Sequence, residues 1–320
     1  MAMTCKMRKS SEKHKSVSVF QWVDLPKDPL TEVFKLCNPT DALMTLPLVC
    51  KYWGRIFLEP IICKQKDNCL NFMPLREKPF YEFFYQSEDK NTRAMRLMKL
   101  LVGVMHAFAC DNQSDAVGND VGVTPIIKII FPHDLPLHER HFVYVAERCP
   151  QLKSIILPCA RDVTGKGITR AMRFWTGMEE MTLALFCRRL QYDLQLFGTI
   201  KEIRKSCKNL HCLQLNGFDL NSKSADILVR SLKSLKLLCL SGAYIHKQGL
   251  QIFFSRYNEL DKVKFLGCIF FTSEGRELVS EINIMRIQER RKTRWRTDKY
   301  PDDIGKLHTA EELVDLLWKW

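Results

Sequence analysis

The thirteen cysteines are the residues of this chain best suited to bind a metal or to act as nucleophiles. Zinc ribbons and RING fingers use cysteine pairs separated by two residues, and the sequence contains no such pair. An odd number of cysteines without a hydrophobic signal segment is typical of reduced thiols. We therefore predict no metal site and expect several cysteines to serve as small apolar core residues.

Two short motifs could carry other chemistry. The run His138-Glu139-Arg140-His141 lacks the spacing of a zinc helix, in which two histidines lie four residues apart, so we interpret it as a solvated helix start. The segment Val163-Thr164-Gly165-Lys166-Gly167-Ile168 resembles a phosphate loop but lacks the upstream glycine, and we interpret it as a turn into a helix. We predict no catalytic residue and no cofactor.

The elements that could instead position a binding surface begin in the segment Trp22 to Phe57. Asp28 is a suitable N-cap and Pro29 a suitable first helical residue, which predicts a helix to about Leu36. Asn38-Pro39 ends that helix, Thr40 or Asp41 can cap a second helix, and Pro47 can start a third. Helices this short are marginal alone, so we expect the unit to pack on a partner or on the next domain.

This segment resembles an F-box, and in particular the F-box at the start of plant F-box/leucine-rich-repeat proteins. The matching residues are Trp22-Val23-Asp24-Leu25-Pro26, Val33-Phe34 and Pro47-Leu48-Val49-Cys50-Lys51-Tyr52-Trp53. In that family the module binds the Skp adaptor, which is attached to a cullin. The resemblance implies adaptor contacts at Trp22, Leu25, Pro26, Val33, Phe34, Leu48, Val49 and Trp53.

Two positions depart from the family pattern, because Pro29 and Cys37 stand where leucine is common. A lost leucine-sized contact costs about 1–2 kcal/mol, which would weaken such an interface without abolishing it. The alternative is that the three helices only cap the following domain and bind no adaptor.

A second feature is an internal repeat of the pattern apolar-x-x-apolar-x-apolar. Its copies begin at steps of 26, 26, 32, 25 and 25 residues, at Ile126, Leu152, Met178, Leu210, Leu235 and Leu260. The period and the pattern predict a leucine-rich-repeat solenoid, curved, with one strand and one helix per repeat. We assign the longer step to an insertion between Phe186 and Ile200. Cysteines just before the next strand, at Cys149 and Cys207, resemble the cysteine-containing repeats of F-box proteins.

The predicted fold is therefore α/β, with an N-terminal three-helix F-box followed by the solenoid. A helical pattern from Thr92 to Phe108 predicts the solenoid's N-terminal cap, and Thr309 with Glu312 predicts a capping box for a final helix. We expect that helix, which carries Leu313, Leu316, Leu317 and Trp320, to fold back on the last repeat, although it could instead dock into a partner's groove. The predicted domains are a basic N-terminus (1–19), the F-box (20–60), a linker and cap (61–124), the leucine-rich repeats (125–285) and a basic C-terminal tail with the final helix (286–320).

The net charge of +13 raises the alternative of nucleic-acid binding. Residues 1–19 contribute +4 and Arg286 to Lys299 contribute +5, so most of the excess lies outside the repeats. We interpret Gln288 to Arg296, within the second block, as a nuclear-import patch, an RNA contact or a solvated helix end. No apolar run is long enough for a membrane span, and the N-terminus lacks a signal core. We expect a protein of the nucleus, the cytoplasm or both, without membrane attachment and with nucleic acid an improbable partner.

The resemblance implies a non-catalytic substrate receptor of an SCF (Skp-cullin-F-box) ubiquitin ligase, whose repeats hold an unknown target protein. The alternative is a repeat scaffold or nucleic-acid-associated protein whose F-box-like segment is only structural. Target contacts are expected on the inner strand surface, at Lys128, Ile130, Ser154, Ile156, Glu180, Thr182, Cys212, Gln214, Asn216, Cys239, Ser241, Lys262 and Lys264. Within that set, our target-site prediction comprises Ile130, Ser154, Ile156, Thr182, Gln214, Asn216, Ser241 and Lys264.

Overall fold

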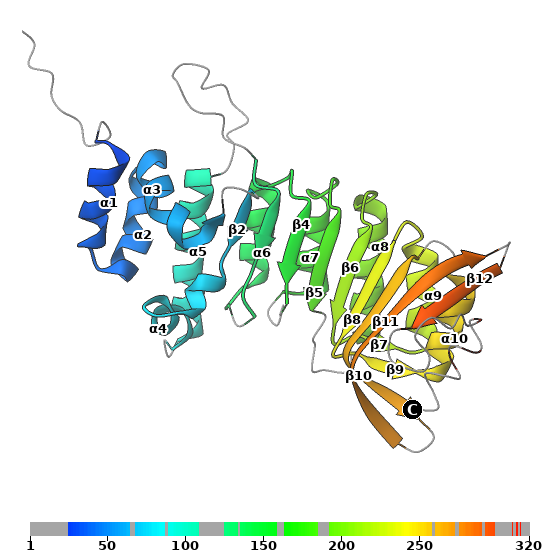
Figure 1. Ribbon diagram of the computed structural model, residues 1–320. Coiled ribbons are helices and arrows are strands. Elements are labelled where there is room, and N and C mark those ends of the chain that lie inside the picture. The colour runs from blue at the N-terminus through cyan, green and yellow to red at the C-terminus, as the bar shows by residue number, and fades with distance from the viewer. Residues whose placement is uncertain are drawn as a thin grey trace, which may run out of the picture.

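A computed structural model shows the arrangement of the chain (Figure 1). It describes residues 25–64, 68–86, 89–108, 125–133, 135–158, 163–184, 192–257, 260–272, 275–289 and 292–297, together with Thr309, Glu312 and Val314. Within these residues, no helix combines the length and the apolar composition that a membrane span requires.

Three helices open the described chain: α1 (Lys27–Lys35), α2 (Pro39–Val49) and α3 (Lys51–Ile62). Three of the predicted boundaries were wrong. Helix α1 begins at Lys27 with Pro26 in the N-cap position, so Asp28 lies in the first turn and is not the cap. Helix α2 is capped by the side chain of Asn38 instead of Thr40 or Asp41, and it continues through Pro47. Helix α3 starts only after Cys50, whose backbone is extended and whose Sγ accepts a hydrogen bond from the amide of Trp53 at 3.4 Å. Pro47 is tolerated near the end of α2, where only the closing turn loses a hydrogen bond.

The three helices have a small core of their own, formed by Leu30, Phe34, Ala42, Leu46 and Ile56. The Phe34 ring contacts the rings of Trp53 and Phe57 edge-on, at centroid distances of 5.3 and 6.1 Å. Such edge-to-face contacts add to the stabilisation that comes from burial alone. The unit is thus held together from inside and does not need its exposed apolar side chains for packing.

Helix α5 (Lys90–Phe108) joins this unit to the rest of the molecule. Pro47 of α2 lies against two glycines: a Cβ on Gly103 would come within 2.8 Å of the Pro47 Cβ, and one on Gly54 within 3.2 Å of the Pro47 Cα. Arg55 Nε donates to the carbonyl oxygen of Ala107 at 2.8 Å. These close contacts fix the three helices against α5. Helix α4 (Phe80–Tyr85) packs on the first half of α5, and a short 3-10 helix (Met73–Arg76) packs on α4 and α3.

Beyond α5, the chain repeats a strand and a helix. The parallel strands are β2 (Cys69–Asn71), β3 (Lys128–Ile130), β4 (Ser154–Leu157), β5 (Glu180–Ala184), β6 (Cys212–Asn216), β8 (Leu237–Ser241) and β10 (Lys262–Thr272), and they lie side by side in chain order in one open sheet (Figure 1). The middle apolar residue of every predicted repeat pairs with its counterpart, in the row Ile129, Ile155, Met181, Leu213, Leu238 and Val263. Leu70 of β2 extends that row, and this earlier strand was not predicted. A two-residue strand, β1 (Cys63–Lys64), pairs antiparallel with β2.

The helices between the strands cover one face of the sheet (Figure 1). They are α6 (Glu139–Arg148), α7 (Gly165–Met172), α8 (Tyr192–Ser206), α9 (Ser222–Ser231) and α10 (Lys247–Arg256). Their apolar side chains and the inward side chains of the strands form one continuous core, which also includes Leu43, Leu58 and Ile62 of the first three helices. The predicted insertion begins among residues outside the described ranges, and its described part belongs to α8.

The last three repeats carry a second, smaller set of strands. After β6, β8 and the first half of β10, the chain turns at Gly217, Gly242 and Gly267, whose φ angles of 70°, 56° and 58° favour glycine. The turned chain forms β7 (Asp219–Leu220), β9 (Tyr244–His246) and the second half of β10, which pair in parallel. We refer to these three glycines as the glycine corners.

The C-terminal end of the sheet is antiparallel. Strand β10 pairs with β11 (Gly275–Glu289), and β11 pairs with β12 (Lys292–Thr297). The expectation of a solvated helix end at residues 288–296 was therefore wrong, and β11 crosses the domain boundary that we predicted at residue 286. This segment forms a strand because buried and exposed side chains alternate along it. Trp295 and Thr297 are buried, and Arg296 between them is half exposed.

The predicted capping box of the final helix is confirmed. The Thr309 amide donates to Glu312 Oε2 at 2.8 Å, and the Glu312 amide donates to Thr309 Oγ1 at 3.2 Å. Val314 is buried within the main core, as expected of a helix that folds back on the last repeat. Leu313, Leu316, Leu317 and Trp320 lie outside the described residues.

Candidate binding surfaces

The first three helices leave a set of large apolar side chains in solvent. Leu36 at the end of α1 is 88% exposed and Val49 at the end of α2 is 57% exposed, while Val33, Leu48 and Tyr52 are also exposed. Because the unit has its own core, these side chains are not needed for its packing. A concentration of exposed apolar residues on a small unit is typical of a protein-binding surface. We call these five residues the apolar docking set.

The adaptor residues predicted from the sequence divide into two groups. Val33, Leu48 and Val49 belong to the docking set, and Pro26 is exposed beside it at the start of α1. Phe34 is buried, and Leu25 and Trp53 are half buried against the same small core, so these three support the surface from inside. Trp22 lies outside the described residues.

Sequence reasoning missed two members of the docking set. Leu36 follows Val33 by three residues, a helical spacing that could have identified it. The Tyr52 hydroxyl donates to the carbonyl oxygen of Leu25 at 2.9 Å and so ties the start of α3 to the segment before α1. No sequence pattern announces that bond, because the two residues are 27 positions apart.

The inner strand surface carries the predicted target residues in regular rows. Cross-strand pairing aligns Ser154 with Glu180, and Ser154 Oγ donates to Glu180 Oε2 at 3.3 Å. In the next row, Ile130, Ile156, Thr182 and Gln214 are paired in sequence, and Asn216 and Ser241 are paired in the row after it. These residues, together with Lys128, Cys212, Lys262 and Lys264, are half exposed, and Glu180 is exposed. The structure brings the predicted set onto one face.

Cys239 is the exception on this face, because it is buried. Burial raises the pKa of its thiol to about 11, against a smaller opposing effect of the nearby Lys264 ammonium. Burial also raises the pKa of the Cys212 thiol. Both thiols are therefore protonated at neutral pH, and the surface is better suited to contacts than to nucleophilic chemistry.

Comparison with known proteins identifies the N-terminal unit. Residues 22–65 match the family model described as the F-box domain. The chain is 25% identical over 242 residues to "F-box/LRR-repeat protein At3g48880" of Arabidopsis thaliana, an alignment that covers 75% of this chain and 69% of the relative. It is 23% identical over 262 residues to "Putative F-box/LRR-repeat protein 23" of the same plant, covering 77% of this chain and 48% of the relative. This chain therefore contains an F-box domain and is similar to plant F-box/LRR-repeat proteins.

A third relative, "Putative F-box protein At4g05475" of Arabidopsis thaliana, is 23% identical over 195 residues. That alignment covers 61% of this F-box protein and 49% of the relative. The alignments thus span about half the length of two of these three relatives. The F-box match includes all of α1, α2 and α3, which are the helices that carry the docking set.

The two motifs that could carry other chemistry have structural roles in this F-box protein. Thr164 caps α7, and its Oγ1 donates to Glu139 Oε2 at 2.5 Å. A Cβ at Gly167 would collide with the Glu139 side chain, so this glycine lets Glu139 pack against the start of α7. His141 is fully buried, and its Nδ1 accepts a hydrogen bond from the His138 amide at 3.0 Å, which closes the start of α6.

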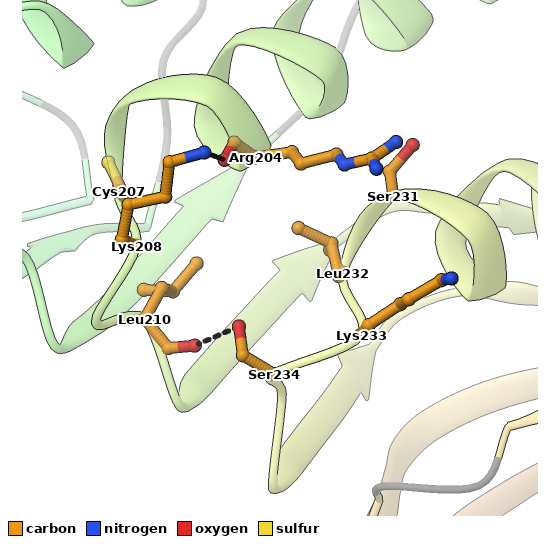
Figure 2. A pocket seen from close by; sticks show the side chains of 8 residues that line it. All are labelled: Arg204, Cys207, Lys208, Leu210, Ser231, Leu232, Lys233 and Ser234. Atoms are coloured by element: carbon orange, nitrogen blue, oxygen red, sulfur yellow. Dashed lines mark hydrogen bonds between the residues drawn. The ribbon is translucent and has the colours of Figure 1, made fainter.

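A hollow of about 260 Å³ lies between the carboxyl ends of α8 and α9 (Figure 2). It has a basic rim, and Lys208 Nζ donates to the carbonyl oxygen of Arg204 at 3.1 Å. Cations at the carboxyl end of a helix balance the partial negative charge of its free carbonyl groups, and the same partial charge disfavours a bound anion. We attribute the basic rim to helix termination. The lining residues are Arg204, Cys207, Lys208, Leu210, Ser231, Leu232, Lys233 and Ser234.

Proposed function

We propose that this F-box protein is a non-catalytic substrate-recognition subunit of an SCF ubiquitin ligase. Its F-box would bind a Skp adaptor and, through it, a cullin, and its strand–helix repeats would form a leucine-rich-repeat solenoid that holds a target protein for ubiquitination in the nucleus or cytoplasm. One observation carries the proposal: the matched F-box segment has a complete core and still exposes Leu36, Val49 and the rest of the docking set. These apolar side chains are removed from water only when a partner protein covers them.

The close packing of α2 on α5 supports this role. Pro47 fits against Gly54 and Gly103, and His106 Nδ1 lies 3.0 Å from the Pro47 carbonyl oxygen. The docking set and the repeats therefore belong to one packed body. A ligase subunit of this kind contributes by holding a target at a defined position relative to the ubiquitin-loaded enzyme, which is a proximity effect.

The test is capture of a purified Skp adaptor by the full chain. The variant Leu36→Asp/Val49→Asp places charges in the docking set without touching the small core, whereas Met95→Asp changes an exposed apolar residue of α5 outside the F-box match. We expect the double variant to lose about tenfold or more in affinity, as buried interface residues do, and Met95→Asp to bind as the unchanged chain does.

Two results would contradict the proposal. One is absence of adaptor binding by the folded, unchanged chain. The other is equal adaptor binding by Leu36→Asp/Val49→Asp and the unchanged chain. Salt-sensitive binding of RNA by a chain that ignores the adaptor would instead favour the scaffold or nucleic-acid alternative.

A further inference from the structure

Beyond the inner strand surface, the chain turns at the glycine corners and continues into the smaller strands β7, β9 and the second half of β10. Strand pairing places Asp219, Tyr244, Ile269 and Leu278 in one cross-strand row. Leu278 is 71% exposed and Tyr244 is 42% exposed. Their neighbours along the strands, Ile245 and Phe270, are buried on the opposite side. Three of the four outward side chains of this row, those of Tyr244, Ile269 and Leu278, are therefore apolar although the core does not require it.

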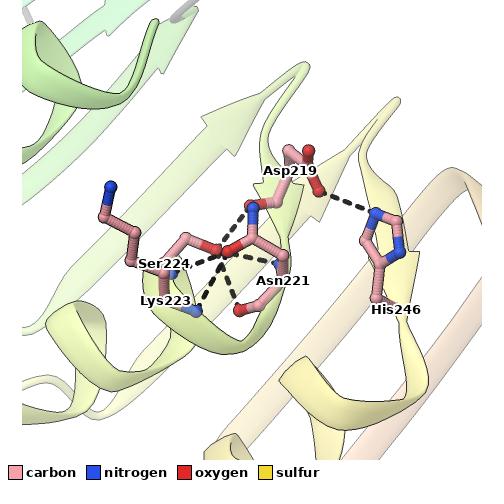
Figure 3. Close-up of polar contacts among 5 residues, drawn as sticks. All are labelled: Asp219, Asn221, Lys223, Ser224 and His246. Carbon is pink, nitrogen blue, oxygen red and sulfur yellow. Dashed lines mark hydrogen bonds and ion pairs between the residues drawn. The ribbon is translucent and has the colours of Figure 1, made fainter.

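A second row lies directly beside the first. His246, Phe271 and Arg276 are cross-strand neighbours. The His246 ring stacks on Phe271 at 4.6 Å between centroids, and the Arg276 guanidinium lies over the same ring at 5.3 Å. His246 Nε2 is 3.0 Å from Asp219 Oδ1, so an ion pair holds the imidazole in place when it is protonated (Figure 3). The ring cluster is thus fixed by contacts from β7, β9, β10 and β11.

We call the six residues Tyr244, His246, Ile269, Phe271, Arg276 and Leu278 the corner face. Aromatic side chains and arginine are the residue types most enriched where proteins bind one another. Here they are grouped on a sheet surface whose exposed apolar area has no role in the described core.

The charges around the corner face indicate the kind of partner. Farther up β10 and its neighbours, on the inner strand surface before the Gly267 corner, lie Lys262, Lys264 and Arg296, with the exposed Met285 among them. Together with Arg276, these are four cations among the described outward side chains of β10, β11 and β12, against the carboxylates of Asp219 and Glu281. Complementary charge would attract an acidic partner.

We propose that the corner face binds the target protein through an acidic segment that also carries apolar side chains. This inference rests on the proposed function, since it names the chemistry of the target for the same receptor. A protein segment fits better than nucleic acid, because Leu278 is 71% exposed and aliphatic and can be buried only against apolar side chains, whereas the rings of the corner face could serve either partner. The exposed Glu281 of β11, on the near side of the Gly267 corner, would also repel a phosphate backbone.

The test measures fluorescence anisotropy of a labelled peptide in which leucine alternates with aspartate, titrated with the full chain. Two control peptides replace aspartate by lysine or leucine by serine, and a uridine oligonucleotide serves as the nucleic-acid probe. The variant Tyr244→Thr/Leu278→Thr removes the exposed apolar area while keeping side chains that favour strands. The matched control, Phe174→Ala/Met95→Ala, removes two exposed apolar residues from the ends of α7 and α5 instead.

We expect the leucine–aspartate peptide to bind most tightly and the Tyr244→Thr/Leu278→Thr variant to lose about tenfold or more in affinity for it. Arg276→Glu should weaken binding as well, more at low salt than at high salt, and the control variant should bind normally. Equal affinity of Tyr244→Thr/Leu278→Thr and Phe174→Ala/Met95→Ala for the leucine–aspartate peptide would overturn the proposal. So would absence of binding of the leucine–aspartate peptide, or a preference for the lysine peptide or the oligonucleotide. Self-association of the chain that Tyr244→Thr/Leu278→Thr abolishes would also overturn it, by assigning the face to a second copy.

Skp adaptor capture is measured on the same preparations, which separates the two proposals. A chain that captures the adaptor and fails the peptide test disproves the corner-face inference and leaves the proposed function standing. A chain that binds the leucine–aspartate peptide through the corner face and captures no adaptor disproves the ligase role and keeps the binding site.

Discussion

The imidazole of His141 is fully buried where α6 begins, and its Nδ1 can accept the His138 amide hydrogen only while that nitrogen is unprotonated. Burial, with smaller effects of the Arg140 and His138 charges, lowers the pKa of His141 from 6.5 to about 4. A residue that looks like part of a metal motif in the sequence is thus a neutral hydrogen-bond acceptor that holds a helix start.

His141 should make the free energy of unfolding depend on pH. Its folded pKa lies below its unfolded value, so the unfolded chain binds the proton more readily, and stability is full above pH 6.5 and falls as the pH drops toward 4. By pH 5 the loss from this residue should reach about 2 kcal/mol. Urea unfolding at several pH values, compared with a His141→Gln variant, measures it. The same pH slope in both proteins would contradict the assignment.

Burial also determines the reactivity of the cysteines. It raises the pKa of Cys207 to about 12 and that of Cys63 to about 11, while Cys37 on the F-box is exposed. Since the thiolate is the reacting form, iodoacetamide should modify Cys37 before the other cysteines of the described ranges, and Cys207 only as fast as the protein unfolds. Site-resolved mass spectrometry over time is the measurement. Denaturant should abolish the difference, and fast labelling of Cys207 in the folded protein would contradict it.

At the scale of elements, the contact of α2 with α5 depends on two glycines, which have no side chain. Gly54 and Gly103 let the Pro47 turn approach so closely that any Cβ on Gly103 would be 2.8 Å from the Pro47 ring. No neighbouring side chain is free to move aside, because Pro47 is itself buried in α2. This contact sets the position of the F-box relative to the repeats.

Replacing Gly103 by leucine should therefore destabilise the protein although leucine favours helix by about 1 kcal/mol over glycine. We expect a net loss of about 1–3 kcal/mol from overpacking, together with weaker coupling between the F-box and the repeats. Thermal unfolding followed by circular dichroism gives the net change. The matched variant is Gly198→Leu in α8, where an added Cβ meets nothing within 4 Å. It should be neutral or stabilising, and equal destabilisation by both variants would show that packing on Pro47 is not the cause.

The parts of the fold that follow from periodicity could be predicted from the sequence. The six repeat anchors pair in register, and the predicted helix from Thr92 to Phe108 is found as α5. The start of α3 could not be predicted in the same way, because Pro47 would be a good first helical residue and only packing on Gly54 and Gly103 shows that α2 continues through it. Local propensity is weak where tertiary contacts decide.

The candidate surfaces also differ in how far the sequence could predict them. The family pattern located Val33, Leu48 and Val49, and alternation located the inner strand face. The corner face was missed, because three glycines with positive φ look like ordinary loop glycines until the strands after them are seen to pair. Strands β11 and β12 were not predicted, because their many charged residues hide the alternation of inward and outward side chains. In that alternation Ile282 and Ile284 point inward.

At the scale of the whole molecule, the docking set and the corner face lie toward opposite ends of one elongated body (Figure 1). A single core runs from Leu43 in α2 to Val314 near the C-terminus, so the ends are joined by packed side chains along the whole described length. Repeat proteins of this kind expose the core at each end unless a different structure covers it. Helix α5 covers the first end, and the antiparallel strands β11 and β12 cover the last.

Trp295 is the residue on which the second cover most depends. It is fully buried, and its ring contacts Phe254 of α10 edge-on at 4.8 Å between centroids. Trp295→Ala should cost about 3–5 kcal/mol, the usual loss for a buried aromatic residue, and should expose the end of the core to solvent. We expect a lower urea midpoint and increased binding of an apolar dye. Phe174→Ala, which removes a ring that is 39% exposed, should change neither. An unchanged urea midpoint and unchanged dye binding in Trp295→Ala would show that β12 does not cover the end of the core.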